Sequence, residues 1–316
     1  MSNIDSVFER FPDYIREYIY RHSWDSLREI QLLAADSLFN SENNLLLTSS
    51  TASGKTEAAF FPILTMLEGN LPESIAVLYI APLKSLINDQ FYRLDELLEA
   101  SGIPLTHWHG DVSASQKSKL LKSPEGILQI TPESLEAMLI NRSNDIPRLF
   151  CDLRYIVIDE IHTLMGTDRG NQIICQLSRL QRLIYNSPRR IGLSATIGDA
   201  KIAADWLGTG SGRDPEMPEL PAEKIKWRLG LEHFYIQNQN PNQTNLTPEN
   251  SDAKAMFDAG YEYIYDCVKN KKALVFSNSR EETEYITATL RQIAKTKGEE
   301  DIFTIHHGNL SASLRE

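Results

Sequence analysis

Cysteine and long apolar runs are both scarce in this chain of 316 residues. The three cysteines, Cys151, Cys175 and Cys267, lie far apart, match no metal-binding spacing and are odd in number, which argues against a disulfide framework. No apolar run approaches the roughly 18 residues that span a bilayer, and residues 1–10 lack the apolar core of a signal peptide. The sequence therefore predicts a protein of the reducing cytoplasm.

Basic residues are also few. Lys and Arg total 32 against 43 Asp and Glu, so the net charge is −11 and the isoelectric point is about 5.2. A basic footprint is the usual mark of a nucleic-acid binder. Its absence argues against a protein that binds nucleic acid by charge alone. A protein that binds nucleic acid through backbone amides, helix N-termini and a few local cations remains compatible with the sequence.

A small-residue loop between an apolar strand and a helix is the strongest local signal. The run Leu45–Leu47 leads into Ser49–Ser53 and then Gly54-Lys55-Thr56. Short side chains let backbone N–H groups surround a phosphate, and a helix N-terminus adds partial positive charge. Lys55 is expected to reach the β- and γ-phosphates of ATP, and Thr56 to ligate Mg²⁺. Ser49 replaces the first Gly of the strict pattern, so an ordinary strand-to-helix turn is the alternative.

A second signal is the pair of carboxylates at the end of the apolar strand 155–158. Asp159 is expected to hold Mg²⁺, and Glu160 to polarise the attacking water. Adjacent acids at the end of a buried strand are costly unless they meet a cation. His162 is expected to connect this loop to a neighbouring loop by a hydrogen bond, although a lone histidine is equally compatible with a structural role.

Three other predicted strands end in polar loops. Lys84 and Ser85 follow strand 75–80. They are expected either to bind a nucleic-acid phosphate or to form a plain strand–helix connection. Thr131 is a predicted N-cap and Pro132 is the first residue of predicted helix 132–140. The N-terminus of this helix is a second predicted anion-binding site. Ser194 and Thr196 follow strand 190–193 and are predicted to bond to the 159–162 loop and sense the γ-phosphate.

Two more polar features are ambiguous by themselves. Gln31, on predicted helix 26–39, has the paired donor and acceptor that read an adenine edge, but a surface glutamine is the alternative. The phosphate loop that follows favours adenine recognition. His107 and His109 follow the spacing of metal ligands, but no third ligand is near, so a metal is disfavoured.

Alternating strands and helices predict an α/β protein with a parallel sheet, and the length suits about two domains. Residues 1–23 are a predicted helical extension, 24–207 the first domain, and the Gly- and Pro-rich 208–223 a linker. A second domain is predicted over 224–316, with a polar surface loop at 237–254. Its predicted elements are strands 227–236, 273–276 and 302–306 and helices 255–270 and 281–296.

Taken together, these motifs resemble those of superfamily 2 nucleic-acid helicases with a DEIH box, most of all the large helicase-related (Lhr) branch. The similarity covers residues 24–316 and includes the run Met165–Gly170. The resemblance implies ATP-binding roles for Gln31, Thr51, Ala52, Ser53, Gly54, Lys55 and Thr56. It implies catalytic roles for Lys55, Asp159 and Glu160, and coupling roles for His162, Ser194, Ala195 and Thr196. Nucleic-acid contacts are implied for Pro82, Leu83, Lys84, Ser85, Thr131, Pro132, Glu133, Ser277, Asn278, Ser279 and Arg280.

The resemblance also implies a RecA-like first domain, an incomplete second RecA-like domain, and ATP and Mg²⁺ as cofactors. It implies a single-stranded or partly duplex nucleic acid as partner, DNA in preference to RNA, together with the remainder of the second domain. The family's motifs V and VI, with the arginine finger, have no counterpart here, so weak hydrolysis is expected of this chain alone. A nucleotide-dependent switch without unwinding, and a P-loop kinase or transport ATPase, are the rival hypotheses.

Overall fold

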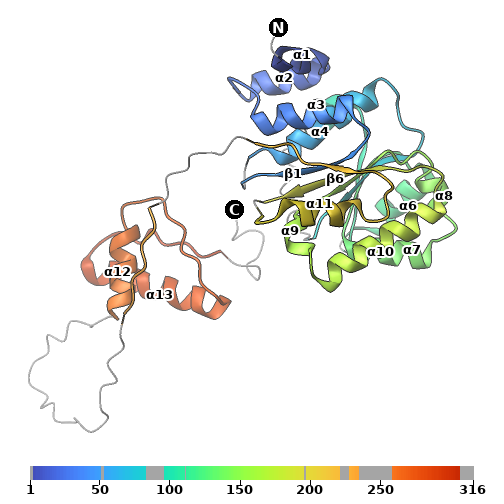
Figure 1. Cartoon of the computed structure of the whole chain (residues 1–316). Coiled ribbons are helices and arrows are strands. Elements are labelled where there is room, and N and C mark those ends of the chain that lie inside the picture. The colour runs from blue at the N-terminus through green and yellow to red at the C-terminus, as the bar shows by residue number, and fades with distance from the viewer. Residues whose placement is uncertain are drawn as a thin grey trace, which may run out of the picture. The chain divides into compact units, whose positions relative to one another are not determined.

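The structure, a computed structural model, describes residues 3–50, 53–82, 96–110, 112–195, 197–220, 228–234 and 258–306, with side chains from Val7 onward. The chain divides into two compact units, 1–223 and 224–316, and each is described by itself. Figure 1 shows the sheet and helices of the first unit. In the described part of the chain, no helix has the length and apolar character needed to cross a bilayer.

The first unit is built on a parallel sheet of seven strands, in the order β3-β4-β2-β5-β6-β1-β7. The strands are β1 (Asn44–Thr48), β2 (Ile75–Ile80), β3 (Leu105–Trp108), β4 (Gly126–Ile130), β5 (Tyr155–Ile158), β6 (Arg189–Ser194) and β7 (Pro215–Glu216). The predicted α/β class with a parallel sheet is confirmed. Central strands are apolar throughout because helices bury both faces of the sheet.

Successive residues of each strand supply two separate cores. Val77 and Val157 lie in one core, whereas Leu78 and Ile156 lie in the other. This is the alternation that a pleated strand imposes. Helices from two parts of the chain cover the two faces, as Figure 1 shows.

The first face is covered by α3 (Glu29–Asn40) and α4 (Lys55–Glu68), and α1 (Asn3–Arg10) and α2 (Asp13–Arg21) pack on these two helices (Figure 1). The second is covered by α6 (Ala114–Lys122), α7 (Pro132–Asn141), α8 (Ile146–Leu149), α9 (Ile161–Leu164), α10 (Asp168–Leu183) and α11 (Ala200–Gly208). The predicted N-terminal helices and helix 132–140 are confirmed. Predicted helix 26–39 begins later, at Glu29, because Arg28 is an extended N-cap whose backbone N–H donates to Gln31 Oε1.

Part of the predicted linker belongs to the sheet instead. Pro215 and Glu216 form β7, which pairs with the start of β1, and the Asn44 side chain donates to Ser211 Oγ at 2.7 Å. Gly and Pro composition indicated a loop, but pairing with β1 satisfies this segment's backbone. A very short edge strand of this kind leaves little unpaired backbone at the margin of a sheet.

The second unit contains α12 (Ala259–Val268) and α13 (Arg280–Lys297), which pack around Tyr265 and Ile293. The expected strands 227–236, 273–276 and 302–306 are not strands in their described parts. Leu274 and Phe276 are 85% and 87% exposed. A strand requires a neighbour whose N–H and C=O groups pair with its own, and apolar composition alone does not provide one.

Two arginines at the start of β6 reach the C-terminal ends of two helices on opposite faces. Arg189 Nη1 donates to Leu38 O at 3.0 Å, in the last turn of α3, and to Ser41 O at 2.7 Å, directly after the helix. Arg190 Nη1 donates to Leu207 O at 3.0 Å and to the carbonyl that follows α11 at 2.7 Å. Burial lowers the pKa of Arg190 to about 10, so it stays charged at neutral pH. Each cation therefore satisfies carbonyls that a helix end leaves unpaired.

Arg189→Met is expected to destabilise the first unit by about 3 kcal/mol, because several buried or partly buried carbonyls lose a charged donor at once. For a unit of this size that corresponds to roughly 6–12 °C in melting temperature. Circular dichroism melts of the full chain would measure the change. Arg182→Met, at an exposed position in the last turn of α10, is the matched control. Equal melting temperatures for the two variants would contradict a capping role for Arg189.

Candidate functional site

The sequence motifs meet at one edge of the sheet. In a parallel sheet the carboxyl ends of all strands lie at the same edge, where ligands bind. β1 leads there into the loop before α4, β5 into Asp159 and Glu160, and β6 into Ala195. Since β6 lies between β1 and β5, the phosphate loop and the acid pair are two strands apart.

The Lys55 side chain bonds back to the start of the phosphate loop. Lys55 is the first residue of α4, and its Nζ donates to Ser49 O at 2.9 Å and to Ser50 O at 2.8 Å. Gly54 has φ +83°, which favours glycine. A Cβ on Gly54 would lie 2.8 Å from Gln31 Nε2, so α3 and the loop are in close contact.

Gln31 is buried beside this loop and is not a surface residue. It is 1% exposed, and its Oε1 accepts from Arg28 N at 2.9 Å. Its Nε2 has no hydrogen-bond partner among the described residues. A buried donor without an acceptor is costly, so this amide is suited to an acceptor supplied by a ligand. The surface alternative for Gln31 is therefore wrong, while adenine recognition stays a prediction.

The charges of Lys55 and the acid pair act on one another. Burial lowers the pKa of Lys55, and the carboxylates of Glu160 and Asp159 act in the opposite direction. Burial and then Asp159 raise the pKa of Glu160, against the effects of His162 and Lys55. Such mutual effects mean that these groups lie near one another, as a joint phosphate and water-activating site requires.

The acid pair is held by its own backbone and by a tyrosine. Glu160 has φ 51° and ψ 42°, a left-handed conformation that is costly for a non-glycine residue and is concentrated at functional sites. Asp159, 2% exposed, accepts from Glu160 N at 2.9 Å and from the Tyr79 hydroxyl at 2.6 Å. Tyr79 was not among the predicted site residues. Its only sequence signal is a single hydroxyl within the apolar strand 75–80.

His162 joins the acid pair to the loop after β6. Its Nδ1 accepts from Ala195 N at 3.1 Å and lies 3.5 Å from Ser194 Oγ. Because Nδ1 is an acceptor, the neutral ring carries its proton on Nε2, which lies 3.3 Å from Glu160 Oε2. The structure thus brings His162, Ser194 and Ala195 together, as the sequence predicted for these two loops.

The loop after β4 is held by a helix cap and an ion pair. Thr131 Oγ1 accepts from Ser134 N at 3.3 Å, and Pro132 is the first residue of α7, so the predicted cap is confirmed. Glu133 accepts from Arg169 through two hydrogen bonds of 2.7 and 3.0 Å. Arg169 lies in the run 165–170, which therefore supports the first turn of α7.

The remaining predicted contact residues lie elsewhere or outside the described residues. Pro82 follows β2 and is buried. In the second unit Ser279 caps α13 by accepting from Glu282 N at 3.1 Å, beside Ser277, Asn278 and Arg280. The predicted residues outside the described part of the chain are Thr51, Ala52, Leu83, Lys84, Ser85 and Thr196.

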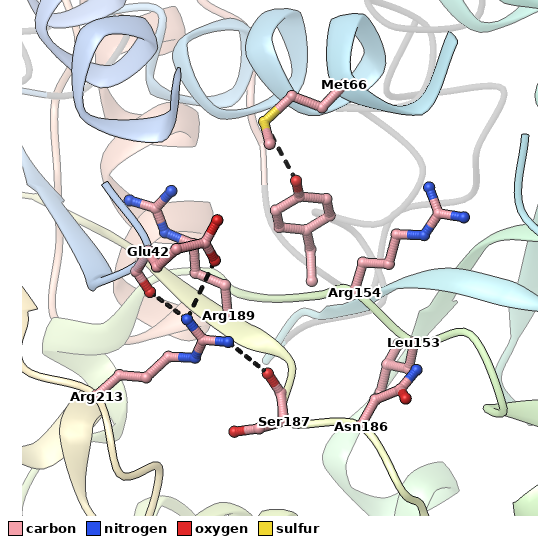
Figure 2. A pocket seen from close by; sticks show the side chains of 9 residues that line it. Glu42, Met66, Leu153, Arg154, Asn186, Ser187, Arg189 and Arg213 are labelled. Atoms are coloured by element: carbon pink, nitrogen blue, oxygen red, sulfur yellow. Dashed lines mark hydrogen bonds and ion pairs between the residues drawn. The ribbon is translucent and has the colours of Figure 1, made fainter. Parts of the chain in front are cut away.

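A cavity of about 220 Å³ lies at the amino ends of the strands, away from these motifs. Figure 2 shows Arg213 in its wall between Glu42 and Ser187. The guanidinium groups of Arg154 and Arg189, which also line it, donate to backbone carbonyls. These arginines support the fold at the edge opposite the phosphate loop.

A lysine in a small-residue loop near an acid pair, at the carboxyl edge of a parallel sheet, defines a P-loop nucleotide-binding protein. The family described as DEAD/DEAH box helicase matches residues 28–204. The chain belongs to this family, and its first unit has the RecA-like fold of these helicases.

Two curated relatives are ATP-dependent helicases named Lhr-Core, from Methanothermobacter thermautotrophicus and Methanocaldococcus jannaschii. They are 29% and 30% identical over 94% and 98% of this chain, which covers 35% and 36% of their lengths. The chain therefore spans about a third of these relatives. A solved structure of Mycobacterium smegmatis helicase Lhr bound to ssDNA and AMP-PNP matches with a TM-score of 0.69 and 28% identity. That match covers 98% of this chain and 40% of the other.

Proposed function

We propose that this chain forms the ATP-binding part of a nucleic-acid helicase or translocase. The observation that carries the proposal is the contact chain from Glu160 through His162 to Ala195, which begins at a carboxylate whose charge acts on Lys55. A change at the phosphates, transmitted along these residues, moves the loop that follows β6. A motor requires such a link between nucleotide chemistry and movement.

The proposed roles follow from the chemistry of each group. Lys55 binds the β- and γ-phosphates, Gln31 reads the adenine edge, and Glu160 takes the proton of the attacking water. The hydroxyl of Thr56 and the carboxylate of Asp159 are hard oxygen ligands that fit Mg²⁺. Magnesium neutralises charge on the phosphates when bound. The described residues contain no cluster of three His, Cys, Asp or Glu, which suits a metal held largely by substrate phosphates.

The proposed partner is a single strand of DNA, on its own or beside a duplex. The similarity to a helicase solved with ssDNA supports DNA over RNA. The helix starts at Thr131 and Ser279 carry the partial positive charge of a helix N-terminus, which suits phosphates, so we expect binding with little sequence preference. We place the protein in the cytoplasm, in line with the three free cysteines.

The test is ATP hydrolysis by the full-length protein, with and without single-stranded DNA or RNA of matched sequence. DNA is expected to stimulate turnover more than RNA does. His162→Ala removes the link between Glu160 and the loop after β6, so the stimulation by DNA is expected to fall by about tenfold, with DNA affinity retained.

Tyr155→Phe is the matched control, because the Tyr155 hydroxyl bonds to Met66 Sδ at 3.2 Å, away from the site. Strand displacement by the same preparations separates a motor from a switch. ATP hydrolysis without displacement or translocation would favour the switch. Phosphate transfer to another acceptor would favour a kinase.

A further inference from the structure

We propose that Tyr79 is a positioning residue for Asp159, and that its hydroxyl fixes the carboxylate in the orientation that receives the nucleotide-bound Mg²⁺. This inference rests on the proposed function, because it concerns the same site. Neither the sequence motifs nor the family match assigns Tyr79 a role.

Strand register places the two side chains together. Tyr79 on β2 lies opposite Val157 on β5, so Asp159 is its diagonal neighbour on the same face of the sheet. Asp159 N donates to Ile80 O at 2.9 Å, which continues the pairing beyond the end of β5. An aromatic side chain spans this diagonal separation. The distance of 2.6 Å between the hydroxyl and Asp159 Oδ2 is typical of a hydrogen bond to a carboxylate.

The tyrosine ring is itself held by the helix that begins with Lys55. Phe60 on α4 packs on Tyr79 with 5.9 Å between the ring centroids, and both side chains are 2% exposed. A ring packed in this way has little rotational freedom. The hydroxyl is therefore fixed relative both to the sheet and to the phosphate-binding helix.

Two donors on different oxygens fix the plane of the carboxylate. Oδ1 accepts from Glu160 N, and Oδ2 accepts from Tyr79. With the Tyr79 hydroxyl removed, Oδ2 loses this donor and the carboxylate gains freedom to rotate. Residues that orient a metal ligand typically contribute about 10–100-fold to metal affinity.

Tyr79→Phe keeps the ring and removes only the hydroxyl. We expect this variant of the full-length protein to need about tenfold more Mg²⁺ for half-maximal binding of a fluorescent ATP analogue. Its affinity for the analogue in EDTA is expected to match wild type, because the phosphate loop is unchanged. A tyrosine with a purely packing role would leave the Mg²⁺ requirement unaltered.

Asp159→Asn and the double variant Tyr79→Phe/Asp159→Asn complete a cycle. If Tyr79 acts through Asp159, removing the hydroxyl has no further effect on the Mg²⁺ requirement once Asp159 is replaced. Tyr155→Phe, which loses a hydroxyl from the same face of β5, is expected to behave as wild type.

The outcomes separate the two hypotheses. An unchanged Mg²⁺ requirement in Tyr79→Phe, or an equal effect in both backgrounds, would overturn the role of Tyr79 alone. Wild-type protein that shows no Mg²⁺-dependent binding of ATP would overturn the proposed function instead. Melting temperatures, measured on each variant, show whether a lost response reflects lost folding.

Discussion

Glu160→Gln is expected to lower ATP turnover by about 10²–10⁴-fold while nucleotide affinity stays within about twofold of wild type. Glutamine has the same length as glutamate, and its amide oxygen can still accept from His162 Nε2, which lies 3.3 Å from Glu160 Oε2 in the structure. It cannot accept a proton from water. The loss therefore falls on the chemical step, and single-turnover hydrolysis with saturating single-stranded DNA would measure it.

The pKa of Glu160 gives this prediction a pH dependence. Burial and Asp159 raise that pKa, and only the ionised carboxylate acts as a base. Wild-type turnover is therefore expected to fall as the pH is lowered through a value above the usual pKa of about 4.3. The residual activity of Glu160→Gln is expected to lack this step. An identical profile in both proteins would assign the base to another group.

The same raised pKa makes a statement about stability. A carboxyl group whose pKa is raised by folding contributes stability below its unfolded pKa, and that contribution is lost as the pH rises through the folded pKa. The melting temperature of Glu160→Gln is therefore expected to exceed that of wild type at neutral pH and to equal it in acid.

For Glu133 the pKa shift, and with it the effect on stability, has the opposite sign. Burial raises its pKa, but hydrogen bonds from Arg169 and the backbone outweigh burial and leave it lowered. Glu133→Gln is expected to melt below wild type at neutral pH, and this difference shrinks as the pH falls. A shift of the same sign in both variants would contradict this electrostatic account.

The sequence predicted the parts of the site that depend on local pattern. Apolar runs that end in polar residues predicted that the loop before Lys55 and Asp159 each follow a strand. The parallel topology then brings both to one edge of the sheet. Thr131 followed by Pro132 specified its helix start through cap chemistry that involves only neighbouring residues. Such signals act within a few residues, so the chain displays them directly.

What the sequence missed depends on partners far away in the chain. Tyr79 acquires its role from strand register with β5, and Arg189 from the end of α3. Pro215 joins the sheet only because β1 offers its edge. The expected strand 273–276 fails for the converse reason, since none of the described residues pairs with this apolar run. The left-handed backbone of Glu160 has no sequence signal at all.

Lys55→Met is expected to weaken ATP binding by about 100-fold or more, which corresponds to roughly 3 kcal/mol. Methionine retains most of the apolar stem and loses the charge. In the structure the ammonium group donates to Ser49 O and Ser50 O, so it already lies within the loop that is to receive the phosphates. Titration with a fluorescent ATP analogue in the presence of Mg²⁺ would measure the loss.

The effect of Lys55→Met on the stability of the nucleotide-free protein should differ from its effect on ATP binding. Burial lowers the pKa of Lys55, so the charged side chain pays for desolvation that its two carbonyl bonds and the acid pair only partly offset. We therefore expect the melting temperature of nucleotide-free Lys55→Met to stay close to wild type. Lys201→Met, at an exposed position on α11, is the matched control and should change neither quantity.

Comparison of the two site variants separates nucleotide binding from hydrolysis at this edge of the sheet. Lys55→Met should bind nucleotide weakly, whereas Glu160→Gln should bind it as wild type does and turn it over slowly. If Lys55→Met bound ATP as wild type does, the phosphates would have to be held elsewhere, away from the contact chain from Glu160 to Ala195. If both variants lost binding equally, Glu160 would act as part of the nucleotide cradle, since a base that acts only on water contributes nothing to ground-state affinity.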